Sequence, residues 1–109
     1  MTETAPSSVA VTLSFTPALE ERVIDWLLTR DDVATFTAYA VDAHGAGHEA
    51  LSVAEQVSGR QRRIEVRVEL PAAALDGWLE ALGNAFGAAD VRYFVTPILR
   101  SGRLRADKL

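Results

Sequence analysis

The segment from Arg60 to Leu70 alternates between charged and apolar side chains along most of its length. Successive side chains of a β-strand point to opposite faces of the sheet, so this period of two predicts a half-buried strand. One face carries the apolar residues Ile64, Val66, Val68 and Leu70. The other face carries the charged residues Arg63, Glu65, Arg67 and Glu69. Pro71 ends the strand, because proline cannot donate a hydrogen bond to the ladder.

Three other segments are predicted to be strands. Residues 9–15 alternate in the same way, with Val9, Val11, Leu13 and Phe15 on one face. Residues 33–41 are rich in β-branched and aromatic side chains, which favour strands. The last predicted strand spans residues 91–99.

Two helices are predicted between these strands. Thr16 and Pro17 begin the first, since threonine is a good cap and proline fits the first helical turn. The second follows Pro71 and carries one apolar stripe, ending before Gly87. Its members are Leu75, Leu79, Leu82 and Phe86.

The order strand, helix, strand, strand, helix, strand predicts an α+β fold, the ferredoxin-like βαββαβ sandwich. Right-handed crossovers place both helices on one face of a four-stranded antiparallel sheet. We expect a disordered N-terminus at residues 1–8, a single domain at residues 9–103 and a polar tail at residues 104–109.

The sheet face without helices mixes apolar, small and charged side chains. It carries Ala10, Thr12 and Ser14 beside bulky apolar residues of the last strand, such as Phe94 and Ile98 or their neighbours. This mixture predicts self-association, with Arg63 and Arg67 paired to Glu65 and Glu69 within or between subunits. The alternative is an ordinary amphipathic sheet facing water.

Composition excludes several classes of function. The net charge of −4 argues against a broad nucleic-acid surface, and the absence of cysteine excludes disulfides and thiolate chemistry. No apolar run is long enough to span a membrane, and residues 1–8 lack the features of a signal peptide, so we expect a cytoplasmic protein without membrane insertion. No catalytic motif is present, and we expect no enzymatic activity.

The connection at residues 43–59, between the second and third strands, is long for a compact domain. Gly45 and Gly47 allow close approach of the backbone to a ligand. His44, His48 and Glu49 offer imidazole and carboxylate ligands for a divalent transition metal, and the alternative is two histidines of the loop that face solvent.

A basic cluster, Arg60, Arg62 and Arg63, lies at the base of this loop. Arginines at such a place suit phosphate binding, or they guard a strand edge by their charge. Alternation sends Arg62 to the opposite face from Arg63, so the three cannot all meet one phosphate.

The strand order and the long loop together resemble the PII-like superfamily. Within this superfamily, the sequence most resembles the uncharacterised DUF3240 family. Three segments carry this resemblance: residues 44–63, Pro17-Ala18-Leu19-Glu20-Glu21 and Arg100-Ser101-Gly102-Arg103. The loop before the last strand is shorter here than in classical PII proteins, and the long loop contains no tyrosine.

This resemblance implies a homotrimeric regulatory protein that binds an adenine nucleotide in clefts between subunits. The long loop, called the T-loop in PII proteins, would engage a partner. The residues that match nucleotide-binding positions are Gly45, Gly47, Arg63, Arg92, Arg100 and Arg103. Relatives of this kind are associated with heavy-metal efflux systems, which implies a membrane transporter as partner. The alternatives are a metal-binding accessory protein without nucleotide sensing, or a structural oligomer.

Overall fold

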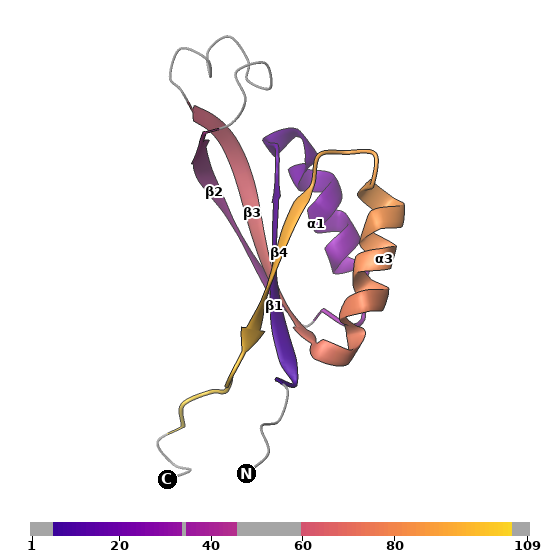
Figure 1. The fold of residues 1–109 in the computed structure, drawn as a ribbon, viewed down its shortest axis with the longest axis vertical. Coiled ribbons are helices and arrows are strands. Elements are labelled where there is room, and N and C mark those ends of the chain that lie inside the picture. The colour runs from indigo at the N-terminus through magenta and orange to yellow at the C-terminus, as the bar shows by residue number, and fades with distance from the viewer. Residues whose placement is uncertain (1–5, 34, 46–59, 106–109) are drawn as a thin grey trace.

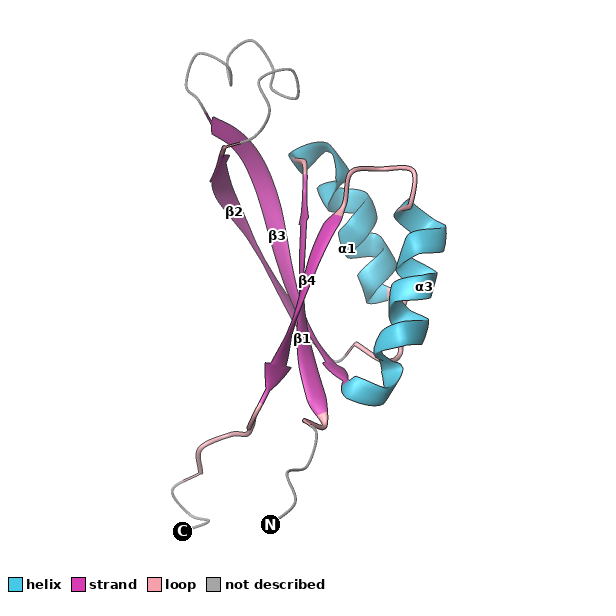
Figure 2. Cartoon of the chain, in the orientation of Figure 1, coloured by secondary structure: helices cyan, strands magenta, loops and turns pink. Residues whose placement is uncertain are grey.

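The computed structural model describes residues 6–33, 35–45 and 60–105. Its four strands form one antiparallel sheet in the order β2-β3-β1-β4, and two helices lie against one face (Figures 1 and 2). The strands are β1 (Ser8–Phe15), β2 (Phe36–His44), β3 (Arg60–Pro71) and β4 (Arg92–Ile98). The helices are α1 (Glu20–Leu28) and α3 (Leu75–Phe86). The predicted α+β ferredoxin-like sandwich is confirmed.

A short 3₁₀ turn precedes each helix. Pro17–Leu19 leads into α1, and Ala72–Ala74 leads into α3. The Thr16 side chain makes no capping hydrogen bond, contrary to the expectation from the sequence. Its backbone carbonyl instead accepts a hydrogen bond of 3.0 Å from the Leu19 N–H, which closes the 3₁₀ turn. No helix in the described part of the chain is long and apolar enough to cross a membrane.

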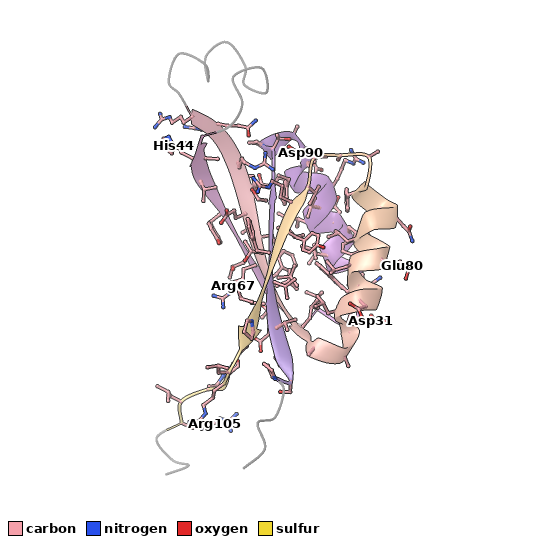
Figure 3. All side chains as sticks on the ribbon, in the orientation of Figure 1. Asp31, His44, Arg67, Glu80, Asp90 and Arg105 are labelled. Atoms are coloured by element: carbon pink, nitrogen blue, oxygen red, sulfur yellow. The ribbon has the colours of Figure 1, made fainter. Side chains whose placement is uncertain are left out.

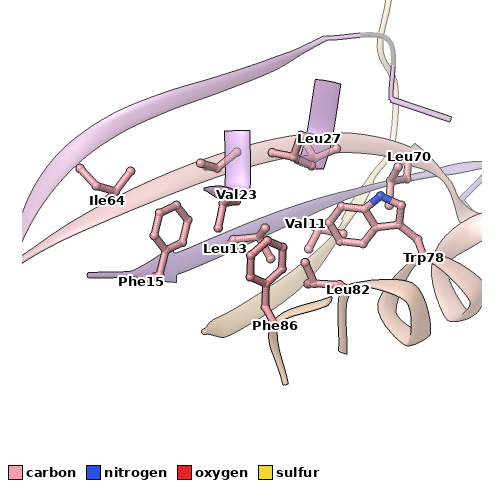
Figure 4. Packing of buried hydrophobic residues seen from close by; sticks show 12 residues of the cluster. Val11, Leu13, Phe15, Val23, Leu27, Ile64, Leu70, Trp78, Leu82 and Phe86 are labelled. Atoms are coloured by element: carbon pink, nitrogen blue, oxygen red, sulfur yellow. The ribbon is translucent and has the colours of Figure 1, made fainter. Parts of the chain in front are cut away.

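The core lies between the helices and the face of the sheet that they cover (Figure 4). The alternating apolar residues of β1 and β3 are buried there against α1 and α3. The Trp78 indole of α3 is 1% exposed and meets the Trp26 ring of α1 edge to face, with ring centroids 5.6 Å apart. Burial of these large side chains stabilises the packing of the helices on the sheet.

The second strand differs from its predicted bounds. β2 begins at Phe36 rather than residue 33, and it ends at His44 rather than residue 41. Val33 packs against the core from the segment before the strand. At the other end, Ala43 and His44 pair with Gln61 and Arg60 of β3, so the connection predicted at residues 43–59 begins two residues later.

We call the helix-free face of the sheet the open face. Residues paired directly across strands share a face, so the register identifies its members. They include Ala10, Thr12 and Ser14 of β1; Thr37, Tyr39 and Val41 of β2; Arg63, Glu65, Arg67 and Glu69 of β3; and Arg92, Phe94, Thr96 and Ile98 of β4. The sequence left open whether Phe94 and Ile98 or their neighbours lie here, and the register places Phe94 and Ile98 on the open face.

We call the two ends of the sheet the loop end and the tail end. At the loop end β1 and β2 finish and β3 and β4 begin, and at the tail end β4 runs out toward residue 105. Figure 3 shows His44 and Asp90 at the loop end and Arg105 at the tail end.

Candidate functional site

Arg63 is buried although it belongs to the open face. Only 6% of its surface is exposed, and its side chain crosses from β3 to the end of β1. A buried guanidinium needs hydrogen-bond acceptors, because burial without them is costly. The loop end supplies these acceptors from two strands.

Ser14 provides two of the acceptors. Arg63 Nε donates to Ser14 Oγ at 2.8 Å, and Arg63 Nη2 donates to the Ser14 carbonyl oxygen at 2.8 Å. Arg63 Nη1 donates to Gln61 Oε1 at 3.1 Å. These bonds hold the plane of the guanidinium across the end of β1.

Asp90 approaches the same guanidinium from the turn before β4. Its Oδ2 lies 3.6 Å from Arg63 Nη1, and its side chain is 74% exposed. The sequence predicted that Arg63 and Arg67 would pair with Glu65 and Glu69 within or between subunits, and within the chain this is not so for Arg63. The described ion pair is instead with Asp90, because the Arg63 side chain leans toward β1 and β4 rather than along its own strand.

Arg92 lies on the other side of Ser14. It pairs with Ser14 across β1 and β4, and its guanidinium carbon lies 5.8 Å from the centre of the Phe94 ring. Arg92 is exposed, unlike Arg63. The register therefore brings these two arginines to one place on the open face, with Ser14 between them.

The end of β2 adds a residue whose backbone requires glycine. Gly45 has a φ of +82°, a left-handed conformation that other residues rarely adopt. Nearby, Arg60 Nη1 donates to Asp42 Oδ2 at 3.3 Å across β2 and β3. The strand conformation thus ends at Gly45, directly after His44.

The predicted metal ligands are covered only in part. His44 is the last residue of β2, whereas His48 and Glu49 lie outside the described residues, as does Gly47 of the nucleotide prediction. Among the residues that the structure describes, no group of three or more His, Cys, Asp or Glu side chains could hold a metal ion.

Arg100 and Arg103 lie at the tail end, where both are exposed. The six steps along β4 from Arg92 to Ile98 correspond to about 20 Å, at the usual rise of a strand. A phosphate bound by Arg92 is therefore out of reach of Arg100 in the same chain. The predicted nucleotide residues that the structure describes therefore fall into two groups at opposite ends of the sheet.

The centre of the open face has an electrostatic coupling between β2 and β3. Tyr39 pairs with Glu65 across the strands. The pKa of Tyr39 is raised above its usual value of 10.0, first by desolvation, then by the hydrogen bond that its phenol donates to Glu65 and by the negative charge of Glu65, while Arg67 opposes the shift. Both effects of Glu65 favour the neutral phenol.

The sequence did not point to Ser14 or Asp90 as parts of the site. Ser14 was placed on the open face as a small polar residue, and Asp90 as the end of a short turn. The alternation of β1 shows which face Ser14 occupies. It does not show that Arg63, 49 positions along the chain, lies against it.

Solved structures of other proteins share this fold. A DUF3240 family protein from Shewanella baltica OS155 superposes with a TM-score of 0.74 at 17% identity, covering 91% of this chain and 98% of that one. CPII, a nitrogen regulatory PII-like protein from Thiomonas intermedia K12 bound to ADP, AMP and bicarbonate, gives 0.64 at 21% identity, covering 90% and 96%. A GlnK–ATP complex of B. subtilis gives 0.62 at 17% identity, covering 89% and 86%.

At these identities the structural matches establish the fold alone. No curated protein matches the chain. The sequence model of DUF3240, a family described as proteins of unknown function, matches residues 5–105, which is nearly the whole of this chain of 109 residues. The chain therefore belongs to the DUF3240 family, and its fold is that of the PII-like proteins.

Proposed function

We propose that this chain is a PII-like regulatory protein that binds the phosphates of an adenine nucleotide between copies of itself. The observation that carries the proposal is the placement of Arg63 and Arg92 on either side of Ser14 at the loop end. Guanidinium groups bind phosphate oxygens through paired, charge-assisted hydrogen bonds. Two of them beside one hydroxyl make the loop end suited to an oxyanion.

The open face supports assembly into a homotrimer. Phe94 is 52% exposed there and Tyr39 is 44% exposed, beside the half-buried Ile98. Contact with other copies would remove these side chains from water, which favours association. In such an assembly Arg100 and Arg103 of one copy complete the site that Arg63 and Arg92 begin on its neighbour.

The choice of an adenine nucleotide rests on proteins of the same fold. CPII was solved with ADP, AMP and bicarbonate, and GlnK with ATP. Both match this chain over about nine-tenths of its length. We carry the ligand class over from them as a proposal, because the arginines at the two ends of the sheet have the charge that it needs.

The remaining parts of the function stay predictions. The connection after His44 would engage a partner, which the family resemblance suggests is a heavy-metal efflux transporter. His44, His48 and Glu49 would bind a divalent metal in the alternative role of a metal-binding accessory protein. In either case the protein would act in the cytoplasm and catalyse no reaction.

Calorimetry with ADP tests the proposal. Arg92→Ala should weaken ADP binding by about ten- to a hundredfold, since it removes one or two charged hydrogen bonds. Arg22→Ala is the matched control, because Arg22 lies on α1, against Phe86 on the covered side of the sheet. Arg63→Ala is less informative, since it also removes internal hydrogen bonds. Absence of ADP binding by the wild type, or equal affinity in Arg92→Ala, would contradict the proposal.

A further inference from the structure

The Arg63 guanidinium has one side fixed inside the chain and one side turned toward Asp90. We infer that Asp90 is a built-in competitor for the phosphate at Arg63, so that a bound oxyanion replaces the Asp90 carboxylate at Arg63 Nη1. This inference rests on the proposed function, because it takes Arg63 as part of the phosphate site. It adds that the empty site is closed by the protein's own carboxylate.

The inner side of the guanidinium is held in place. Its Nε and Nη2 both donate to Ser14 at 2.8 Å, one to the hydroxyl and one to the backbone carbonyl. A carbonyl in the central strand β1 cannot move without disturbing the sheet. Arg63 therefore cannot swing out to meet a ligand, and a ligand must come to the Nη1 side.

The Nη1 side is occupied by a weakly held partner. The Nη1–Oδ2 separation of 3.6 Å is longer than a good hydrogen bond, and the Asp90 side chain is 74% exposed. Exposed ion pairs contribute little to stability. A phosphate carries more charge and more acceptor oxygens than a carboxylate, so it forms the stronger interaction with the same guanidinium.

Replacement of the Asp90 carboxylate by a phosphate at Arg63 Nη1 would also affect two other segments. Gln61, in the second position of β3, accepts a hydrogen bond from the same Nη1 atom at 3.1 Å. Asp90 belongs to the turn between α3 and β4, two residues before Arg92. Displacement of Asp90 therefore frees its side chain, while backbone hydrogen bonds from the Ala89 N–H to the Phe86 carbonyl oxygen and from the Val91 N–H to the Ala89 carbonyl oxygen keep the turn in place. A ligand at Nη1 also lies beside Gln61 at the start of β3. Occupancy of the site is in this way coupled to the base of the long connection.

The test compares Asp90→Asn with the wild type in calorimetric titrations, using ADP and inorganic phosphate as separate probes. Asp25→Asn is the control, because it removes the same charge from the exposed surface of α1. Loss of one exposed competing carboxylate should tighten binding of both probes by about two- to fivefold, as expected for an exposed ion pair. Asp25→Asn should bind both probes as the wild type does.

The outcomes separate the inference from the proposed function. Equal ADP affinity in Asp90→Asn and the wild type would overturn the inference and leave the nucleotide site standing. Tighter phosphate binding by Asp90→Asn, with no ADP binding by either protein, would support the competitor and overturn the nucleotide. No binding of either probe by either protein would overturn both.

Discussion

At the residue scale, one buried arginine organises the loop end. Arg63 links β3 to the end of β1 and to the turn before β4, through Ser14, Gln61 and Asp90. The alternation of residues 63–70 correctly placed Arg63 on the same face as Glu65, Arg67 and Glu69. It could not distinguish Arg63 from the other three, because burial depends on which residues the neighbouring strands bring beside each position.

Ser14→Ala tests this role of Arg63. The substitution removes the Oγ that accepts the Arg63 Nε–H and leaves a buried charged donor without this acceptor. We expect a loss of about 1.5–3 kcal/mol in the free energy of unfolding, measured by urea denaturation at a fixed protein concentration. Ser7→Ala, at an exposed serine, should change stability by less than about 0.5 kcal/mol. Equal stability of Ser14→Ala and Ser7→Ala would show that the contact is not formed.

At the element scale, strands with a clear alternation were predicted closely and the edge strand was not. β1 and β3 bury one face each against the helices, so their period of two is strong. β2 is an edge strand, and most of its residues are exposed on both faces. Its sequence therefore lacks the apolar–polar alternation that would locate its ends. The strand extends to His44 because His44 still pairs with Arg60 of β3.

The end of α3 was predicted just before Gly87, and the structure shows why a glycine follows the helix. Gly87 has a φ of −64°, which any residue can adopt, so a left-handed backbone is not the reason for a glycine here. Its N–H donates to the Gly83 carbonyl oxygen at 2.7 Å, and a Cβ on Gly87 would collide with that same oxygen. Glycine is needed here for space rather than for backbone conformation.

A pair of alanine substitutions tests this account of the turn that leads to Asp90. Gly87→Ala should lower the free energy of unfolding by about 1–3 kcal/mol, as overpacking does. Gly83→Ala should instead raise it by up to about 1 kcal/mol, since a Cβ there meets nothing within 4 Å and alanine favours the helix. Thermal or urea unfolding of both variants gives the comparison. If Gly87→Ala were as stable as the wild type, the close approach to Gly83 would be wrong.

At the scale of the whole molecule, the sequence was sufficient to predict the layers of the fold but not to predict a complete binding site. The order of periodic segments and the right-handed crossover rule predicted two helices on one face of four strands. The predicted nucleotide residues were chosen by resemblance, and the register separates Arg92 from Arg100 by the length of β4. No pattern within one chain could show which groups meet across copies.

The tail end carries a net positive charge, which agrees with the separation of the site arginines into two groups. Residues 99–105 carry Arg100, Arg103 and Arg105 and no acidic residue, a charge of +3, so the rest of the chain carries −4 − 3 = −7. A basic segment on an acidic body favours contact with a second copy, in addition to any anionic ligand between them. The proposed site therefore depends on the assembly.

ADP titration of mixed assemblies tests this dependence most directly. One variant, Arg92→Ala, lacks the exposed arginine that the loop end contributes to the proposed site, and the other, Arg100→Ala with Arg103→Ala, lacks the two arginines that the tail end contributes. Each should bind ADP weakly alone. In assemblies formed from equal amounts of both, about a quarter of the sites between copies would join two intact ends. The account predicts that this fraction regains wild-type affinity. Mixed assemblies without any site of wild-type affinity would contradict it.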